Sequence, residues 1–243
     1  MSHREPTRND FEEGITTPKK LNDYDMGWRF ASQNLKINSN IYYMDYEDQL
    51  VLSGELNDVG APLRTTSGSS YRLGLEIDVD VRLSDAWSLR PNVALSRNKN
   101  RDFVTSIDGE LRSLGETNIS FSPEIVASNM LTYQPVANLQ LSLLSKYVGE
   151  QYMGNIDSEA SLLDSFFIND LNIFYELQNV PVFKSVVFSG LVNNLFDVNY
   201  ESNGYFFTYD DDFSNPGTVT TIEGAGYYPQ AGVNFLAGIT LKF

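Results

Sequence analysis

Strict alternation of apolar and charged residues over 75–83 constrains the fold of this chain more than any other feature. Leu, Ile, Val, Val and Leu occupy the odd positions there, and Glu, Asp, Asp and Arg occupy the even ones. Successive side chains of a β-strand point to opposite faces, so the pattern predicts a strand with one apolar and one polar face. The same period of two recurs over 35–43, 87–97, 139–147 and 235–243. The chain is therefore expected to be all-β.

The segments that separate the predicted strands alternate between tight turns and long polar connections. Strands are predicted near 22–31, 35–50, 62–83, 87–105, 117–133, 139–150, 165–178, 185–207 and 227–243. Tight breaks fall at Ser32–Asn34, Ser84–Ala86, Gln134–Asn138 and Asn179–Lys184, and long ones span roughly 51–61, 106–116, 151–164 and 208–226. Outer-membrane barrels combine short periplasmic turns with long extracellular loops. The pattern predicts about nine long antiparallel strands of a transmembrane β-barrel, or ten if residues 1–10 end another, upward strand.

Composition excludes several classes of function. The net charge of −15 and the lack of Lys and Arg clusters argue against a nucleic-acid partner. With no cysteine and a single histidine, His3, thiolate or histidine metal sites and a nucleophile–base pair have no support, so no enzyme, metal site or cofactor is expected. Aromatic residues make up 13% of the chain, which suits strands that cross a membrane interface.

Four segments resemble those of one protein family. Asn194-Leu195-Phe196-Asp197 followed by Tyr200 resembles a signature near the end of TonB-dependent receptors. Residues 227–243, with the terminal aromatic Phe243, look like their last strand. Residues 4–11 are similar to a segment from the middle of the same barrels, and residues 42–50 resemble a recurrent strand of these receptors. The resemblance runs from one end of the chain to the other.

The resemblance implies a receptor with a 22-stranded barrel, an N-terminal plug domain and a segment that binds TonB. Residues 1–243 are accordingly interpreted as the C-terminal portion of such a barrel, without a plug domain and reaching TonB only through a missing N-terminal region. The charged start of the chain has no apolar segment typical of a signal peptide, which favours an origin in the middle of a larger protein. The implied function is active uptake across the bacterial outer membrane of a large, scarce nutrient such as an iron chelate, cobalamin or glycan.

Three sets of candidate functional residues stand out. The segment 205–212 is expected to be an aromatic and acidic loop, in which Tyr205, Tyr209, Asp210, Asp211 and Asp212 are the candidate ligand contacts. A calcium loop is not supported there, because no glycine follows at the sixth position. Asn194, Leu195, Phe196, Asp197 and Tyr200 are interpreted as a structural signature where a strand leaves the membrane. Phe243 is interpreted as an interfacial anchor and as the signal for the barrel-insertion machinery.

Two other interpretations remain open from the sequence. One is a complete small outer-membrane barrel that acts as a passive channel or adhesin. The other is a soluble β-sandwich that binds carbohydrate, since half-buried strands of a sandwich alternate in the same way. The two differ from a receptor in testable ways: a small barrel closes its first strand onto its last, and a sandwich should purify without detergent.

Overall fold

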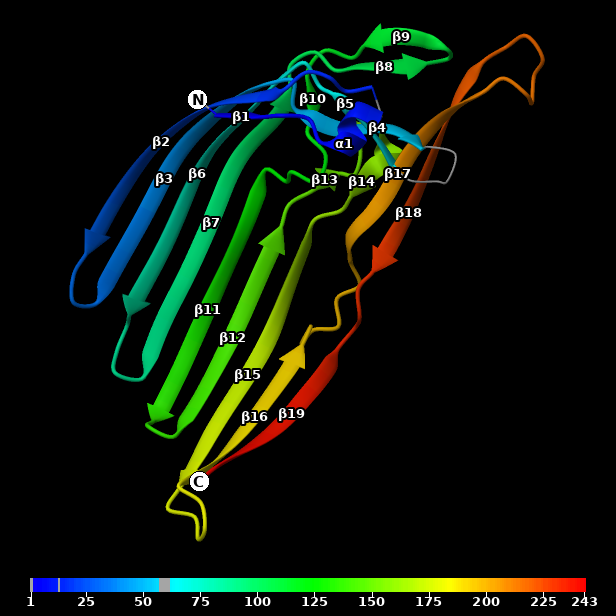
Figure 1. Ribbon diagram of the computed structural model, residues 1–243. Coiled ribbons are helices and arrows are strands. Elements are labelled where there is room, and N and C mark those ends of the chain that lie inside the picture. The colour runs from blue at the N-terminus through cyan, green and yellow to red at the C-terminus, as the bar shows by residue number, and fades with distance from the viewer. Residues whose placement is uncertain (1, 13, 57–61) are drawn as a thin grey trace.

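One long antiparallel sheet forms the body of the molecule in a computed structural model that describes residues 2–12, 14–56 and 62–243. Its strands follow the order β1-β2-β3-β6-β7-β11-β12-β15-β16-β19, and β10 pairs with β7 as an eleventh strand. Figure 1 shows the sheet as a single curved layer, with tight turns at one end and longer excursions at the other. The predicted all-β, antiparallel architecture is confirmed.

The long strands of the sheet have nine to fourteen residues each. They are β2 (Lys19–Ala31), β3 (Leu35–Glu47), β6 (Ser69–Arg82), β7 (Trp87–Asn100), β11 (Ile125–Val136), β12 (Leu139–Val148), β15 (Phe166–Gln178), β16 (Ser185–Asn193) and β19 (Asn234–Lys242). The short members are β1 (Ser2–Arg4) and β10 (Thr117–Asn118). About nine to eleven tilted residues suffice to cross a membrane, so these lengths fit spanning strands.

Strand pairing places the predicted apolar residues of different strands side by side on one face. A single row of directly opposed residues runs through Leu35, Val81, Leu89, Leu131, Leu143, Leu171, Val192 and Phe235. The row crosses eight strands without a polar residue. The alternation predicted within each strand therefore combines into a mainly apolar face, here called the outer face, on which a neighbouring row also holds the polar residues Asn129, Ser145 and Asn169.

The opposite face, here called the inner face, carries polar cross-strand pairs. Arg29 Nε donates to Asn38 Oδ1 at 2.9 Å, and Asn40 Nδ2 donates to Asp25 Oδ1 at 3.1 Å. Charged groups are costly in hydrocarbon, at about 2–4 kcal/mol for an arginine at mid-membrane. The two faces thus differ in the environment that each one tolerates.

The four tight connections join β2 to β3, β6 to β7, β11 to β12 and β15 to β16, as predicted. At the other end, most of the predicted loops contain short strands. They are β4 (Leu50–Leu56) with β5 (Pro62–Thr66), β8 (Val104–Ile107) with β9 (Glu110–Ser113), β13 (Gln151–Tyr152) with β14 (Leu162–Leu163) around the 3₁₀ turn η1 (Glu159–Ser161), and β17 (Glu201–Asp211) with β18 (Thr220–Pro229).

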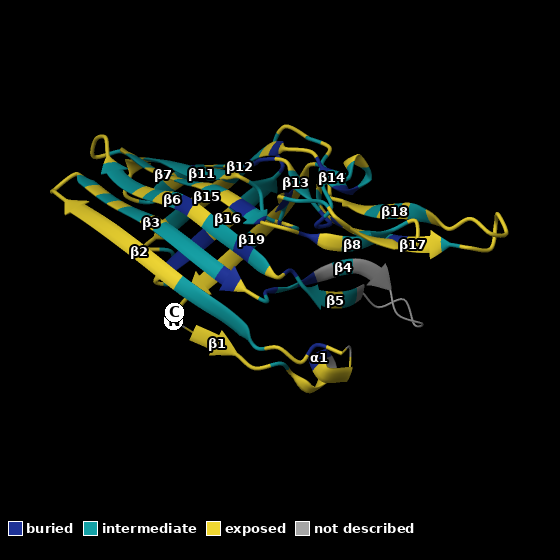
Figure 2. Cartoon of the chain, turned by 90° about the horizontal axis from the view of Figure 1, so that it is seen from above, coloured by how far each residue is buried: buried dark blue, intermediate teal, exposed yellow. Residues whose placement is uncertain are grey.

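The best-buried side chains gather under these excursions. Phe103, Met153 and Leu163 are almost fully buried there, together with the polar Asn100 and Ser70. In Figure 2, β2 by contrast is exposed over most of its length. The small core therefore lies at the excursion end, and the sheet itself has solvent-exposed faces.

Several predicted boundaries are wrong. The single strand predicted over 185–207 is two strands, β16 and β17, and the strand over 227–243 divides into β18 and β19. The break between β16 and β17 contains Asn194 and Asp197 with φ of 49° and 53°, left-handed values that end an extended strand. The segment 205–212 is consequently mostly part of β17 and not a loop.

Further corrections concern residues 1–12, 62–83 and three other predicted strands. Those over 35–50 and 87–105 run across a break into β4 and β8, and that over 117–133 divides into β10 and β11. Only Ser2–Arg4 form the predicted additional strand, and they pair antiparallel with β2; Arg8–Glu12 form a short helix, α1, that was not predicted. The strand predicted over 62–83 divides into β5 and β6, separated by Gly68 at φ 67°. None of the helices in the described part of the chain is long and apolar enough to span a membrane.

The sheet is open between its first and last strands. Among the described residues, neither β1 nor β2 pairs with β19, and the four other sheets have only two strands each. A closed ladder and a pair of packed sheets would characterise the small barrel and the sandwich respectively. The described structure is neither of these; it is a partial barrel wall.

Candidate functional site

The β17–β18 hairpin meets other excursions that are distant from it in sequence. β17 contacts β4 and β14, and β18 contacts β8 and η1. Figure 1 shows the hairpin, in orange and red, rising beyond the tops of β16 and β19. Four of the five candidate ligand contacts, Tyr205, Tyr209, Asp210 and Asp211, lie on β17, and Asp212 follows directly after it.

One face of this hairpin carries a row of aromatic rings, here called the aromatic ladder: Tyr205, Phe207 and Tyr209. Adjacent ring centroids are 6.3 and 6.4 Å apart and adjacent planes are inclined by 14° and 18°. Tyr228 of β18 lies beside the ladder, with its centroid 6.1 Å from that of Tyr205 and its plane inclined by 50°. Tyr205 and Tyr209 are each about half exposed, at 51% and 52%. The ladder thus offers a nearly flat, accessible π surface.

Glycines on the partner strand explain why the rings lie flat. Gly226 is opposite Tyr205 and Gly224 is opposite Phe207. A Cβ atom at either glycine would lie 2.4 Å from the facing ring. Rings can cover glycine backbone across a strand pair in this way because no side chain opposes them. The two glycines of the Gly-x-Gly segment in β18 therefore leave the space that the rings of Tyr205 and Phe207 occupy.

The other face of the hairpin packs against the segment 153–161. The ring of Phe206 lies against Gly154, where a Cβ atom would be only 2.7 Å away. Tyr227 Oη donates to the carbonyl of Ala160 at 3.0 Å, and Thr208 is buried. These contacts hold one face of the hairpin, and the aromatic ladder lies on the opposite face.

The three adjacent carboxylates do not form a common site. Asp210 accepts hydrogen bonds from Thr221 Oγ1 at 2.6 Å and from Ser106 Oγ at 2.9 Å, and these hold the pKa of its carboxyl below the usual range. Asp211 points to the opposite face of β17 and accepts the backbone N–H groups of Phe213 and Ser214, both at 3.0 Å. Its pKa is also lowered, by Ser214 first and then by Phe213.

Asp210 instead joins two hairpins. Ser106 belongs to β8, and the adjoining Asp108 both donates its N–H to Thr221 Oγ1 at 2.7 Å and accepts the Thr221 N–H at 3.1 Å. Within the described residues, no group of three metal-ligating side chains is arranged to hold a metal ion. The structure therefore gives Asp210 and Asp211 structural partners and leaves Asp212 exposed.

The residues of the family signature form a compact clip at the end of β16. The Asn194 side chain donates to the carbonyl of Val198 at 2.8 Å and accepts the N–H of the same residue at 2.9 Å. Its backbone N–H donates to Asp170 Oδ1 of β15 at 2.7 Å, and its side chain reaches the carbonyl of Ala231 at 3.3 Å. The buried Asn194 thereby ties β15, β16 and the start of the last strand together.

The rest of the signature extends this clip. Asp197 Oδ1 accepts the N–H of Val233 at 2.8 Å, and Leu195 donates its N–H to the carbonyl of Asn169 at 2.7 Å. The Tyr200 ring packs on that of Phe166, with centroids 4.5 Å apart, whereas the Phe196 side chain is largely exposed. Phe243 lies at the opposite end of the sheet, where its ring is 5.0 Å from that of Phe183.

Sequence reasoning missed Phe207, Tyr228 and the two glycines of the aromatic ladder. The signal was available: Tyr-x-Phe-x-Tyr has the period of a strand, and Gly-x-Gly follows in the next segment. Because 205–212 was interpreted as a loop, its period was not used.

Comparison with known proteins identifies the family. The model of the TonB dependent receptor-like β-barrel matches residues 13–195. The chain belongs to this family. Among curated protein sequences, none matches the chain.

Solved structures of import receptors and of a transporter share the fold of this barrel wall. The ferric-catecholate import receptor Fiu from E. coli K12 has a TM-score of 0.64 at 17% identity, over 99% of this chain. The copper transporter OprC has a TM-score of 0.63 at 20% identity, over 92% of this chain. The ferric enterobactin receptor PfeA from Pseudomonas aeruginosa has a TM-score of 0.62 at 16% identity, over 94% of this chain. The chain spans 30–32% of the length of these proteins.

Proposed function

We propose that this chain forms part of the wall and extracellular surface of a bacterial outer-membrane TonB-dependent receptor, which actively imports a large, scarce nutrient. The observation that carries the proposal is the apolar row across eight strands in a member of this family. A wall with an apolar outer face and a polar inner face suits lipid on one side and a hydrated lumen on the other. The tight turns then lie in the periplasm.

The energy for import would come from TonB, acting on a plug domain outside residues 1–243. The chain itself would contribute binding and passage and no chemistry. Similar proteins are named as receptors for ferric catecholates and as a copper transporter. An iron chelate, a metal, cobalamin or a glycan is therefore the class of cargo to test first.

The ligand contacts proposed here are the exposed rings of the aromatic ladder. Stacking on planar aromatic or sugar rings needs accessible ring faces held in place, and Tyr205 and Tyr209 provide them. Of the three carboxylates, only Asp212 stays in this proposal, because Asp210 and Asp211 are held by neighbouring donors. Phe243 is proposed to serve assembly, through the barrel-insertion machinery.

Binding and uptake by the complete receptor test the proposal. We expect one member of a panel of ferric catecholate, ferric hydroxamate, copper, cobalamin and oligosaccharide to bind, and its uptake to require TonB. Tyr205→Ala with Tyr209→Ala should weaken that binding at least about tenfold, which corresponds to about 1.4 kcal/mol. Tyr24→Ala, a half-exposed ring on the outer face of β2, is the matched control and should leave binding unchanged. Uptake that continues without TonB would contradict the proposal.

A further inference from the structure

The aromatic ladder has a shape that suits an extended ligand. Its three rings occupy every second position of β17, from Tyr205 through Phe207 to Tyr209, and side chains on one face of a strand follow its length. Adjacent centroids are 6.3 and 6.4 Å apart, and adjacent planes differ by only 14° and 18°. A compact chelate would cover one or two of these rings, whereas a linear chain of flat units would cover all three.

Exposed polar side chains stand at both ends of this flat apolar platform. Asn203 precedes Tyr205 by two positions, so its side chain starts from the same face of β17. Thr220 of β18 lies opposite Asp211, two positions beyond Tyr209. Asn203 and Thr220 are both exposed. An aromatic platform with amide and hydroxyl groups at its ends suits a ligand with apolar faces and polar rims, and sugar rings have this character.

The hairpin that carries the ladder is negatively charged. Residues 201–230 include five acidic side chains and no Lys, Arg or His. The pKa values of Asp210 and Asp211 are lowered, chiefly by hydrogen bonds from Thr221 and Ser214 respectively, so both carboxylates are ionised at neutral pH. Ferric catecholates are anions, so this surface repels them, whereas it is compatible with an uncharged ligand.

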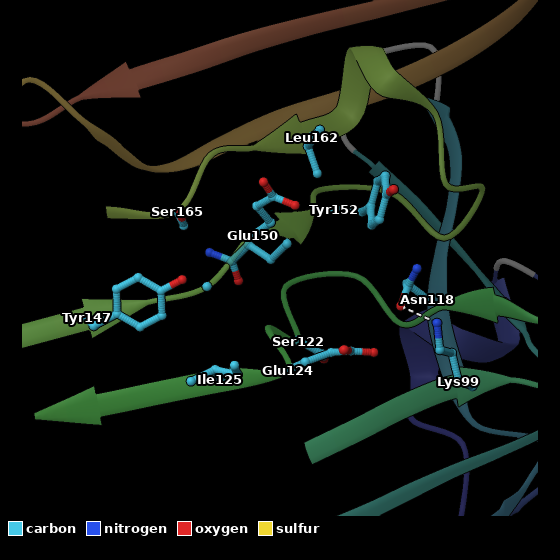
Figure 3. Close-up of a pocket in the computed structure, with 12 residues that line it drawn as sticks. Lys99, Asn118, Ser122, Glu124, Ile125, Tyr147, Glu150, Tyr152, Leu162 and Ser165 are labelled. Carbon is cyan, nitrogen blue, oxygen red and sulfur yellow. Dashed lines mark hydrogen bonds between the residues drawn. The ribbon is translucent and has the colours of Figure 1, made fainter. Parts of the chain in front are cut away.

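Three basic side chains at the excursion end lie on other elements and are held by partners of their own. Arg112 of β9 is 3.8 Å from each of two carboxylates of the β8–β9 hairpin. Arg97 Nη2 of β7 is 2.6 Å from Glu116 Oε1. Lys99 Nζ donates to Asn118 Oδ1 at 2.7 Å in the polar pocket that Figure 3 shows. None of the three is placed on the ladder's hairpin to bind an anion.

We propose that the aromatic ladder binds a neutral, linear oligosaccharide, with its pyranose rings stacked along Tyr205, Phe207 and Tyr209. The C–H faces of the sugars cover the aromatic faces, and hydroxyl groups of the bound stretch form hydrogen bonds with Asn203 and Thr220. This inference rests on the proposed function and narrows its cargo to an uncharged glycan. The charge of the hairpin selects against an anionic iron chelate at this site.

Calorimetric titration of the complete receptor in detergent tests the ligand class. The probes are neutral β-1,4-linked gluco-, xylo- and manno-oligosaccharides of two, four and six units, with a ferric tricatecholate as the anionic comparison. At least one neutral series should bind, and its affinity should rise at least about tenfold from two to six units, because the longer chain covers the whole ladder. Failure of all three series to bind, or an affinity independent of chain length, would overturn the inference. So would binding of the ferric tricatecholate that is lost in Tyr205→Ala.

Variants of the central ring separate stacking from folding. Phe207→Leu keeps an apolar side chain on the hairpin and removes the flat ring, so it should lower the affinity for six units about fivefold or more and flatten the dependence on chain length. Phe207→Tyr restores a ring and should bind like the wild type. Phe213→Ala removes an exposed ring beyond the ladder in the same hairpin, so it is the matched control and should bind normally. Equal affinity of Phe207→Leu and the wild type would overturn the inference.

Failure of this inference is distinguishable from failure of the proposed function, because binding and uptake are measured separately. TonB-dependent uptake of a ferric chelate, without binding of any neutral series, would overturn the inference and leave the receptor function standing. An oligosaccharide that binds the ladder and enters cells without TonB would contradict the receptor function and leave the inference standing.

Discussion

Gly226 lies directly beneath the ring of Tyr205, so close that a Cβ atom on the glycine would be 2.4 Å from the ring. Gly226→Val should therefore tilt or displace Tyr205 and weaken ligand binding by the receptor about as much as Tyr205→Ala does. Gly27→Ala in β2, whose Cβ would be 3.7 Å from its nearest neighbour, should have little effect. Binding isotherms of the two variants compare them. Unchanged binding by Gly226→Val would remove the aromatic ladder from the ligand site.

The buried Asn194 clip should be a stability determinant. Asn194→Ala leaves the Val198 N–H unpaired and places alanine at φ 49°, so we expect the free energy of unfolding to fall by about 2–4 kcal/mol. Asn199→Ala, at an exposed position in the same turn, should change it by less than about 0.5 kcal/mol. Urea unfolding in detergent micelles measures both. Equal changes in the free energy of unfolding of the two variants would show that Asn194 is not a stability determinant.

Acid should release the contact between the β8–β9 and β17–β18 hairpins. The pKa of Asp210 is lowered in the folded state, chiefly by Thr221 and then by Ser106, so its contribution is complete above the unfolded-state pKa of about 3.9. That contribution is lost as the pH falls through the lower folded-state value. The chain has no cysteine, so spin labels at Leu111 and Phe213, two exposed positions, can report the distance between the hairpin tips.

The distance distribution should be narrow at neutral pH and broaden only below about pH 4. Asp210→Asn should broaden the distance distribution at neutral pH. The neutral amide has one acceptor oxygen, so it cannot accept charge-assisted hydrogen bonds from both Thr221 and Ser106. Asp212→Asn is the control and should behave like the wild type. A distribution that is insensitive to both pH and Asp210→Asn would show that other contacts hold the hairpins.

Deletion of Phe243 should reduce the amount of receptor inserted in the outer membrane and leave the ligand affinity of inserted molecules unchanged. The residue is largely exposed and contacts Phe183 through its ring. Phe183→Ala removes the same ring contact and keeps the terminal aromatic, so it separates the two roles. If Phe183→Ala lowers insertion as much as the deletion does, packing explains the effect and the assembly role fails.

Periodicity predicted those strands in which each face has a single environment along the whole strand. Leu75 to Leu83 alternate because one face of β6 meets polar groups and the other does not, and pairing then extends the pattern across the wall. The excursions obey other constraints. The β17–β18 hairpin combines rings over glycine, whose spacing can be read from the sequence, with contacts to 153–161, which cannot.

The boundary errors have the same origin. Asn194 and Asp197 adopt left-handed conformations within a stretch whose flanks both alternate, so 185–207 gave a single predicted strand. Asn and Asp tolerate that conformation better than most residues, which is the local signal that a turn was present. The role of Asp210 could not be predicted, because its hydrogen-bond partners Thr221 and Ser106 are 11 and 104 residues away in the sequence.

Nitroxide accessibility along β6 tests the central claim, that this sheet is a membrane wall, most directly. Labels are placed one at a time at 76–81 in the complete receptor reconstituted in lipid vesicles, and their collision rates with oxygen and with a water-soluble nickel chelate are compared. Ile77, Val79 and Val81 should be accessible to oxygen and protected from nickel, because their side chains lie on the apolar outer face. Glu76, Asp78 and Asp80 should show the reverse. Nickel accessibility without alternation, or with the opposite phase, would contradict the assignment of the outer face to lipid.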